Sequence, residues 1–372
     1  IATIGNNEGM TISHEALNNL YNDAQFKVIC ANVLDEDGHL PHNIATSYIK
    51  EIDNVRFLFV AATAPFTPFY RALDWIVTDP LEAIKDEIEQ HKGQYDVLIV
   101  MSHVGVFFDE KLCQEFPEID VILGSHTHHH FDNGEINNGV LMAATGKYGY
   151  YLGEVNLTIE NKKVINKEAK LHPLDTLPVV QTHFDEEGKD LMNKAIINKP
   201  VSLPSKTNVI TKTSYLLAES VYEFTNADCT IINAGLIVNS VEGDKLTEYD
   251  IHTMLPHPIN LVRIRIKGSE LKKVIIKSQK QEYMYEHVQG LGFRGDIFGG
   301  YILYHCGFIQ SEQRFFIDGK EIADDHTYIL GTVDMYTFGR YFPLLKGTSI
   351  DYLMPEFLRD IFKEKLIHMH RS

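Results

Sequence analysis

The chain has 372 residues, more than one hydrophobic core usually organises, so we expect two domains. Apolar residues make up 44% and charged residues 23%, the balance of an ordinary globular protein. The 34 basic and 51 acidic residues give a formal charge of −17, which argues against nucleic acid or an anionic membrane as partner. A small phosphorylated substrate is compatible with this charge, because a metal cluster dominates the field inside a cleft.

The cysteines and the first residues bear on the cell compartment. The four cysteines follow no C-x-x-C spacing, which favours reduced thiols in a cytoplasmic protein. No apolar run approaches the roughly 18 residues that a membrane helix needs. The chain opens on Ile1-Ala2-Thr3-Ile4, which reads as the end of a buried strand and not as a signal peptide. We therefore expect upstream sequence, and any signal peptide in it, to be missing here.

The first half alternates predicted strands with helices. Strands are expected over 1–5, 27–33, 55–62, 97–101 and 121–123, and helices over 11–22 and 79–92. The second helix has the clearest signals: Asp79 as cap, Pro80 at the first position, Glu82 to complete a capping box and Gly93 as stop. Its buried stripe would be Leu81, Ile84 and Ile88. The alternation indicates βαβ units with a largely parallel sheet. Beyond His130, short antiparallel strands are expected over 140–144, 153–159 and 163–171.

A second architecture follows an expected linker at 173–181. We place the domains at 1–178 and 185–372, with a polar helix starting at Asp185. A helix is expected over 214–225, bearing Leu217, Val221 and Phe224, and a strand over 229–232. Thr247 and Asp250 would cap a second helix, which Pro256 ends, and a strand over 261–266 would have Arg263 and Arg265 on its exposed side. Ser269 would cap a third helix, bearing Leu271, Val274 and Ile275.

Histidines follow two of the buried strands of the first half. The run 97–101 leads to His103, and the run 121–123 leads to His126 and His128. Ligands bind outside the carboxyl ends of such strands, so these groups should share one sheet edge. On an extended segment His126 and His128 would point to the same side. Neutral imidazoles suit Zn, Mn, Co or Fe, and Asn6 can add an amide oxygen. A solvated histidine-rich turn is the alternative, but three strand ends with ligand groups favour a metal.

These blocks resemble those of a known family. Gly5-Asn6-Asn7-Glu8, Ser102-His103-Val104-Gly105 and Gly124-Ser125-His126-Thr127-His128 look like the G-N-H-E, S-H-x-G and G-H-x-H blocks of calcineurin-like metallophosphoesterases. In the second half, Asn233-Ala234-Gly235 resembles the N-G-G block of the 5′-nucleotidase C-terminal domain, and Gly268-x-x-Leu271 its helix start. The chain thus resembles a bacterial 5′-nucleotidase subgroup with GNNE in place of GNHE.

The resemblance implies an N-terminal αββα metallophosphoesterase sandwich and a mixed α/β nucleoside-binding domain. Asn6, His103 and His126 would hold one divalent ion and His128 a second, with a bridging Asp and an Asp-x-His pair expected from upstream sequence. Asn233 and Gly235 would lie near the substrate, and two aromatic rings would sandwich the base. Candidates for the rings are Phe308, Phe338 and Phe342, with plain core packing as the alternative for each.

The sequence departs from the family pattern beside these ligands. The family's catalytic histidine is Asn7 here and its carboxylate partner is Met10, so this pair cannot titrate. The place of a phosphate-binding arginine holds Val238; Arg294 or Arg340 would have to supply that charge, unless each is a solvated surface residue.

Two functions agree with this pattern. The favoured one is a metal-dependent phosphoesterase that hydrolyses nucleotides or related esters with altered activity. The alternative is a non-catalytic protein that binds nucleotide or metal on the same scaffold.

Overall fold

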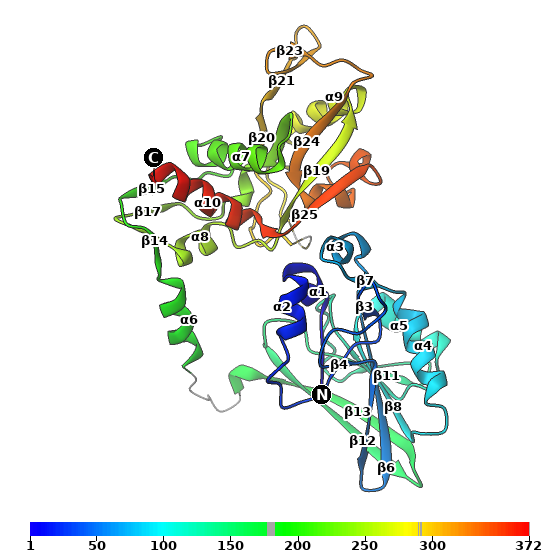
Figure 1. The fold of residues 1–372 in the computed structure, drawn as a ribbon. Helices are drawn as coiled ribbons and strands as arrows, with labels where there is room; N and C mark the ends of the chain where they lie inside the picture. Colours follow the sequence, from blue (N-terminus) through cyan, green and yellow to red (C-terminus); the bar gives the residue numbers. More distant parts are fainter. Residues whose placement is uncertain (177–182, 289, 291, 372) are drawn as a thin grey trace. The chain divides into compact units, whose positions relative to one another are not determined.

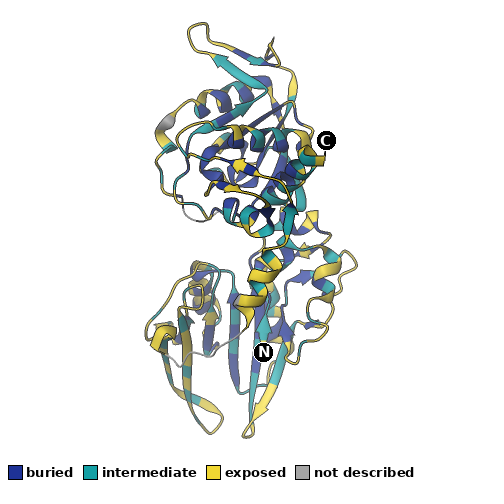
Figure 2. Cartoon of the chain, turned by 90° about the vertical axis from the view of Figure 1, so that its left-hand side faces the viewer, coloured by how far each residue is buried: buried dark blue, intermediate teal, exposed yellow. Residues whose placement is uncertain are grey.

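The computed structural model describes residues 1–176, 183–288, 290 and 292–371, which form two compact units (Figure 1). Unit 1 is Ile1–Gln181 and unit 2 is Thr182–Ser372. Both units mix helices and strands, which confirms the predicted fold class. Acidic residues exceed basic ones by 14 in unit 1 (26 against 12) and by 3 in unit 2 (25 against 22). Buried residues concentrate in the central strands of each unit (Figure 2).

Unit 1 is built on a six-stranded sheet in the order β10-β11-β9-β8-β6-β5. The four inner strands run parallel and the two edge strands antiparallel, so the largely parallel sheet is confirmed. The strands are β5 (Ser47–Ile52), β6 (Val55–Thr63), β8 (Val97–His103), β9 (Val121–Gly124), β10 (Glu135–Asn137) and β11 (Val140–Ala144). Leu58, Val100 and Ile122 of these strands are fully buried. The 140–144 strand was expected to be antiparallel, but β11 joins β9 in parallel and continues the sheet.

Helices α4 (Pro80–Gln90) and α5 (Val106–Glu115) connect the parallel strands. Asp79 caps α4 as predicted, because its carboxylate accepts the N–H groups of Leu81 and Glu82 at 2.8 and 3.2 Å. Ile84 and Ile88 are buried and Leu81 packs against the same core, so the predicted stripe is confirmed. The βαβ order therefore follows from local signals that the sequence displays.

The N-terminal elements are shorter than predicted. The helix expected over 11–22 is present but shorter: the chain forms α2 (His14–Asn19) inside that range, and a separate helix α1 (Asn6–Thr11) precedes it. Ser13 between them is extended, and its hydroxyl caps α2 by accepting the Ala16 N–H at 3.2 Å. Four short strands precede β5: β1 (Ala2–Thr3), β2 (Val28–Ile29), β3 (Val33–Leu34) and β4 (Ile44–Ala45). Two short elements lie between β6 and α4: α3 (Thr67–Ala72) and β7 (Ile76–Val77).

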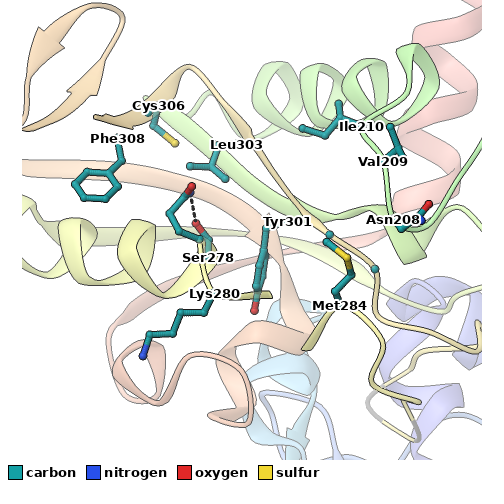
Figure 3. A pocket seen from close by; sticks show the side chains of 14 residues that line it. Asn208, Val209, Ile210, Ser278, Lys280, Met284, Tyr301, Leu303, Cys306 and Phe308 are labelled. Atoms are coloured by element: carbon teal, nitrogen blue, oxygen red, sulfur yellow. Dashed lines mark hydrogen bonds between the residues drawn. The ribbon is translucent and has the colours of Figure 1, made fainter. Parts of the chain in front are cut away.

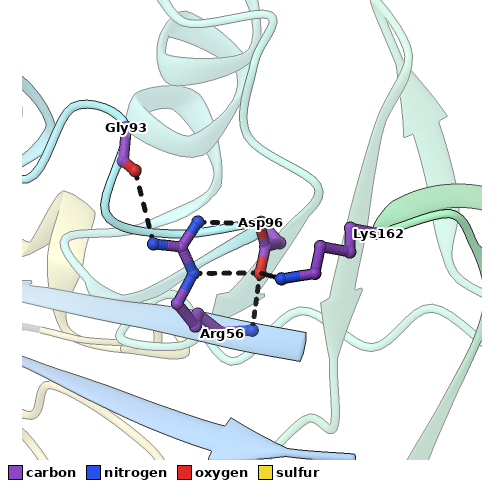
Figure 4. A network of polar contacts seen from close by, with 4 residues as sticks. All are labelled: Arg56, Gly93, Asp96 and Lys162. Atoms are coloured by element: carbon purple, nitrogen blue, oxygen red, sulfur yellow. Dashed lines mark hydrogen bonds and ion pairs between the residues drawn. The ribbon is translucent and has the colours of Figure 1, made fainter. Parts of the chain in front are cut away.

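A long antiparallel ribbon, β12 (Tyr151–Glu160) and β13 (Lys163–Pro173), ends the fold of unit 1. Its turn residue Lys162 lies 3.7 Å from the Asp96 carboxylate, which also takes a two-pronged contact from the Arg56 guanidinium (Figure 4). Hydrogen bonds from Arg56 hold the pKa of Asp96 well below its usual range. Arg56 lies near the start of β6 and Asp96 directly precedes β8, so this ion cluster fastens the strands at the end opposite His103.

The predicted linker is only partly described. Leu174–Thr176 forms a short 3-10 helix, and 177–182 lie outside the described residues. Helix α6 (Phe184–Met192) then begins unit 2 near the predicted Asp185. Among the described residues, no helix has both the length and the apolar character to cross a membrane. Of the four unpaired cysteines, Cys30, Cys113 and Cys229 are buried and Cys306 is half-buried.

Unit 2 is built on a five-stranded sheet in the order β20-β16-β24-β19-β25. Its strands are β16 (Cys229–Asn233), β19 (Asn260–Lys267), β20 (Tyr301–Tyr304), β24 (Thr327–Val333) and β25 (Ser349–Phe357). Its helices are α7 (Lys212–Thr225), α8 (Glu248–Met254), α9 (Gly268–Ser278) and α10 (Leu358–Arg371). Smaller strands are β14 (Ala195–Ile197), β15 (Val201–Leu203), β17 (Val241–Gly243), β18 (Leu246–Thr247), β21 (Cys306–Ile309), β22 (Arg314–Ile317) and β23 (Lys320–Glu321).

Most local predictions for unit 2 are confirmed. Thr247 and Asp250 form the capping box of α8, and β19 leaves Arg265 exposed. Two details are wrong. Phe224 of α7 is 39% exposed, so it does not join the buried Leu217 and Val221. Ser269 does not cap α9, because the helix already starts at Gly268, where a β-carbon would lie 2.0 Å from the Ala323 carbonyl oxygen.

Candidate metal centre

The carboxyl ends of three parallel strands meet at one edge of the unit 1 sheet. Thr63 at the end of β6 is in register with His103 at the end of β8, and Ser102 is in register with Gly124 at the end of β9. His126 follows two residues after β9. The fold therefore brings both predicted histidine groups to the same edge, as expected for a parallel sheet. We call Asn6, His103, His126 and His128 the histidine edge.

Asn6 joins two of these histidines. It is the first residue of α1 and is 8% exposed. Its Oδ1 lies 2.9 Å from His103 Nε2 and 3.0 Å from His126 Nδ1. Two ligand atoms that each bind one ion at about 2.1 Å, side by side, are themselves about 3 Å apart. Both histidine nitrogens thus lie at the distance from the Asn6 oxygen that ligands of one divalent ion would have.

His103 is held in the form that binds a metal. The Ser125 hydroxyl donates to the Ser102 carbonyl at 3.0 Å and lies 2.8 Å from His103 Nδ1. When the single proton of that hydroxyl goes to the Ser102 carbonyl, His103 Nδ1–H donates to Ser125 and the Nε2 lone pair faces Asn6. Burial, with the nearby charges of His126 and His128, lowers the pKa of His103 to about 4. Neutral imidazole is the state that a metal requires.

Replacing Ser125 by alanine should weaken metal binding by about 10- to 100-fold, the usual effect of removing a group that orients a ligand. Without the hydroxyl, His103 Nδ1–H loses its acceptor and the ring loses its fixed tautomer. The measurement is Mn²⁺ or Co²⁺ affinity by competition with a coloured chelator. Ser125→Thr keeps the hydroxyl and should bind within a few-fold of wild type; equally weak binding by both variants would contradict this role.

The segment that carries His126 and His128 is not extended, so the reason given for their shared direction is wrong. Both residues have left-handed backbones, with φ of +67° and +57°. Burial and the charge of His128 lower the pKa of His126, so the two rings are electrostatically coupled. Within the described residues, no three His, Cys, Asp or Glu side chains gather in metal-holding positions, so the Asn6 oxygen is what links His103 to His126. A second ion on His128 stays a prediction.

Two glycines of the predicted blocks are required by close packing at this edge. A β-carbon on Gly5 would lie 2.9 Å from the His103 ring. Gly105 has φ of +112°, and a β-carbon there would lie 2.7 Å from Thr127. Thr127 in turn accepts the Val106 N–H at 3.1 Å and so binds the His126 segment to the start of α5.

In unit 2, Asn233 and Gly235 support a loop. Asn233 is fully buried at the end of β16; its amide donates to the Phe298 carbonyl at 2.5 Å and its oxygen accepts the Tyr336 hydroxyl at 2.8 Å. A β-carbon on Gly235 would lie 2.0 Å from the Ile297 carbonyl oxygen. Both residues therefore fasten the glycine-rich loop, 292–300, to the end of β16. Their predicted contact with substrate stays a prediction.

The glycine-rich loop exposes Arg294. Its backbone N–H donates to His257 Nδ1 at 2.8 Å, and its guanidinium reaches only the Phe293 carbonyl at 3.3 Å among the hydrogen bonds of the described residues. Arg340, the other candidate, is 2.5 Å from the Glu286 carboxylate. Arg294 is therefore the better placed of the two to meet an anion from solution.

The three candidate aromatic rings lie in different environments. Phe342 is 2% exposed and belongs to the core of unit 2, whereas Phe338 is 36% exposed. Phe308 stacks on Phe315 with centroids 4.5 Å apart and lines a cavity of about 370 Å³ together with Tyr301 (Figure 3). Phe342 thus has the core-packing position that was its alternative, and base stacking by Phe308 or Phe338 stays a prediction.

Comparison with known proteins identifies the family. The model of the 5′-nucleotidase C-terminal domain matches residues 194–341. The uncharacterized metallophosphoesterase YunD of Bacillus subtilis is 34% identical over 98% of this chain and 83% of its own length. The chain belongs to the 5′-nucleotidase family of metallophosphoesterases.

Solved structures agree on the fold. A Staphylococcus aureus chain described as a 5′-nucleotidase, in complex with α-ketoglutarate, matches with a TM-score of 0.71 at 16% identity, covering 98% of this chain and 79% of its own. The NAD nucleotidase of Haemophilus influenzae matches with a TM-score of 0.58 at 16% identity, covering 99% of this chain and 81% of its own. At these identities the likeness establishes the 5′-nucleotidase fold alone.

Several residues beside the histidine edge have contacts that were not predicted from the sequence. Phe66 follows the end of β6, and its ring centroid lies 5.7 Å from that of His126. The strand over 55–62 was predicted, so the turn after it could have been assigned to the same edge. Ser125 belongs to one of the blocks quoted above, and Met10 was noted only as the place of a missing carboxylate. The sequence does not show the contacts of either residue, because a serine or methionine acquires a role only through the partner it meets.

His257 is a further residue that sequence reasoning missed in the 5′-nucleotidase C-terminal domain. It is fully buried, its Nε2–H donates to the Leu236 carbonyl at 2.8 Å, and its Nδ1 accepts the Arg294 N–H. Its ring stacks on Phe293 with centroids 4.7 Å apart. His257 therefore couples the segment after β16 to the loop that carries Arg294.

Acid should release this coupling. Burial, helped by the charges of Arg294 and Arg359, lowers the pKa of His257 to about 4. Its ordinary pKa is about 6.5, so between these values the unfolded state binds the proton and the folded state does not. The contribution of neutral His257 to the free energy of unfolding is therefore fully present above pH ~6.5. It falls by about 3 kcal/mol as the pH drops to 4. Protection of the Arg294 amide against hydrogen exchange should fall over this pH range. The same fall is expected in His326→Gln, which changes an exposed histidine outside the loop, and protection that stays constant to pH 4 would contradict the prediction.

Proposed function

We propose that this member of the 5′-nucleotidase family is a metal-dependent phosphoesterase acting on nucleotides or related phosphate esters. The observation that carries the proposal is the meeting of Asn6 Oδ1, His103 Nε2 and His126 Nδ1 at one sheet edge. Burial lowers the pKa of both imidazoles, which disfavours their protonated form and favours the neutral form that binds a cation. The excess of 14 acidic residues in unit 1 also favours divalent cations there.

Two divalent ions of Mn, Zn, Co or Fe are the proposed cofactors. Asn6, His103 and His126 would hold one ion, and His128 would serve the other. When bound, such ions lower the pKa of water and neutralise phosphoryl oxygens. The residues of this chain orient the ligand atoms: Ser125 fixes the His103 ring, and Thr127 fixes the turn that carries His126 and His128.

The leaving group defines the proposed substrate range. Asn7 is exposed on α1 directly after Asn6 and cannot donate a proton to a departing alkoxide. General acid catalysis typically contributes a factor of ~10²–10⁴, so esters that leave without protonation suffer less from its loss. We therefore propose nucleoside diphosphates or pyrophosphate-linked nucleotides as better substrates than nucleoside monophosphates.

Steady-state kinetics with Mn²⁺, Co²⁺ and Zn²⁺ test this proposal. Turnover of an activated aryl phosphate should exceed turnover of AMP by at least tenfold. Equal, slow rates on both esters would contradict the leaving-group proposal. A wild-type protein that binds nucleotide yet hydrolyses neither ester with any of these ions would establish the alternative, a non-catalytic binding protein. Two observations favour this alternative. Asn7 cannot act as an acid, and the carboxamide of Asn233 is already hydrogen-bonded to Phe298 and Tyr336 within unit 2.

A further inference from the structure

The two ends of the Asn6 carboxamide are chemically different, and only one of them can bind a cation. Oδ1 offers lone pairs, whereas Nδ2 carries two protons and repels a metal. A half-turn of the side-chain amide exchanges the two ends without changing its shape. In the structure Oδ1 faces His103 and His126. Something in the surroundings must favour this orientation.

His103 does not favour it when no ion is bound. Because Ser125 takes the His103 Nδ1 proton in a hydrogen bond, the His103 Nε2 lone pair points at Asn6. A lone pair attracts an N–H group and repels a carbonyl oxygen. His103 alone would therefore turn the amide the other way, with Nδ2 toward the imidazole.

Met10 supplies the opposing preference. It lies one helical turn after Asn6 on the same face of α1, is half-buried, and its sulfur accepts the Asn6 Nδ2–H at 3.7 Å. A thioether sulfur accepts hydrogen bonds but donates none, so it favours the amide nitrogen and disfavours the oxygen. The contact between Nδ2 and the sulfur directs Oδ1 to the histidine edge.

We propose that Met10 is a positioning residue that selects the metal-binding orientation of Asn6. The proposal rests on the proposed metal-dependent function and assigns a role within it to a side chain that has no charge and no part in proton transfer. It also gives Met10 a role at the position where the family pattern has a carboxylate, which Asn7 does not need because it does not titrate.

Two substitutions separate the acceptor from the packing. Met10→Leu keeps the volume and removes the sulfur, whereas Met10→Gln keeps the length and offers an oxygen to the Asn6 amide. In metal-free protein, nuclear Overhauser contacts of the Asn6 amide protons should shift from residue 10 to the His103 ring in Met10→Leu only. Affinity for Mn²⁺ or Co²⁺ should fall about tenfold in Met10→Leu and stay within about threefold of wild type in Met10→Gln. Met142→Leu, the same exchange in the buried part of β11, should bind as wild type does.

The outcomes are decisive in either direction. Unchanged metal affinity and unchanged amide contacts in Met10→Leu would overturn the proposal. So would Met10→Gln if it folds normally yet binds as weakly as Met10→Leu, because packing and not hydrogen bonding would then matter. If wild type binds neither ion, the proposed function fails, and the amide contacts in metal-free protein still decide the role of Met10.

Discussion

Replacing Asn7 by histidine should raise the hydrolysis of AMP by about 10²-fold, the lower end of the range for general acid catalysis. Asn7 is exposed and directly follows Asn6, so a histidine there meets no core packing and lies beside the histidine edge. The lower end applies because Met10 cannot orient the new ring as a carboxylate would. The gain should be much smaller on an activated aryl phosphate, whose leaving group needs no proton.

Asn7→Gln is the matched control, since it changes the side chain without adding a titratable group. The pH profile of Asn7→His should gain an acidic-form dependence near pH ~6.5, which Asn7→Gln and wild type lack. An equal gain on AMP and on the aryl ester would show that histidine acts by binding the phosphate and not by protonating the leaving group. No gain on either ester would mean that this position takes no part in the chemistry.

Replacing His103 by alanine should abolish metal-dependent hydrolysis and lower metal affinity by at least 10²-fold. The imidazole is one of three groups whose atoms converge, and the remaining Asn6 oxygen and His126 nitrogen cannot enclose an ion between them. Metal affinity by competition and the metal-dependent rate on an aryl phosphate are the two measurements. His129→Ala is the control, because His129 lies in the same turn but is exposed, and its ring contacts Thr127 and Phe131 and not Asn6, His103 or His126.

A His103→Ala protein that binds Mn²⁺ as wild type does would contradict the assignment of the histidine edge. Loss of binding together with loss of the fold would be uninformative, so the unfolding midpoint of the metal-free variant is measured as well. A metal-free variant that still unfolds in one cooperative transition and no longer binds Mn²⁺ would support the assignment, because the loss of binding would then not be a loss of the fold.

Whether a feature of this molecule can be predicted from the sequence depends on how far apart along the chain its interacting residues lie. The helix at Pro80–Gln90 was predicted well because Asp79 and Pro80 act on neighbouring backbone groups. The histidine edge was predicted because parallel strands must end together, whatever lies between them. The helix over 11–22 was predicted with the wrong bounds, because Ser13 inside that range caps the start of α2 at His14.

The second unit was predicted less well at its site. Whether a phenylalanine packs in the core or faces solvent depends on long-range packing, and so the sequence does not show that Phe342 is buried while Phe338 is exposed. His257 gives no local signal either, because its partners Leu236 and Arg294 lie 21 and 37 residues away along the chain. Residues whose role comes from distant partners are those that sequence reasoning misses.

The unequal distribution of charge has a consequence for the order of binding. With 26 acidic and 12 basic side chains, the unit that carries the histidine edge repels phosphorylated molecules until cations reach it. Divalent ions are drawn by the same field, and each that binds removes part of the repulsion. We therefore expect an ordered mechanism in which ions load first and nucleotide follows, so that metal concentration acts as a gate on substrate entry.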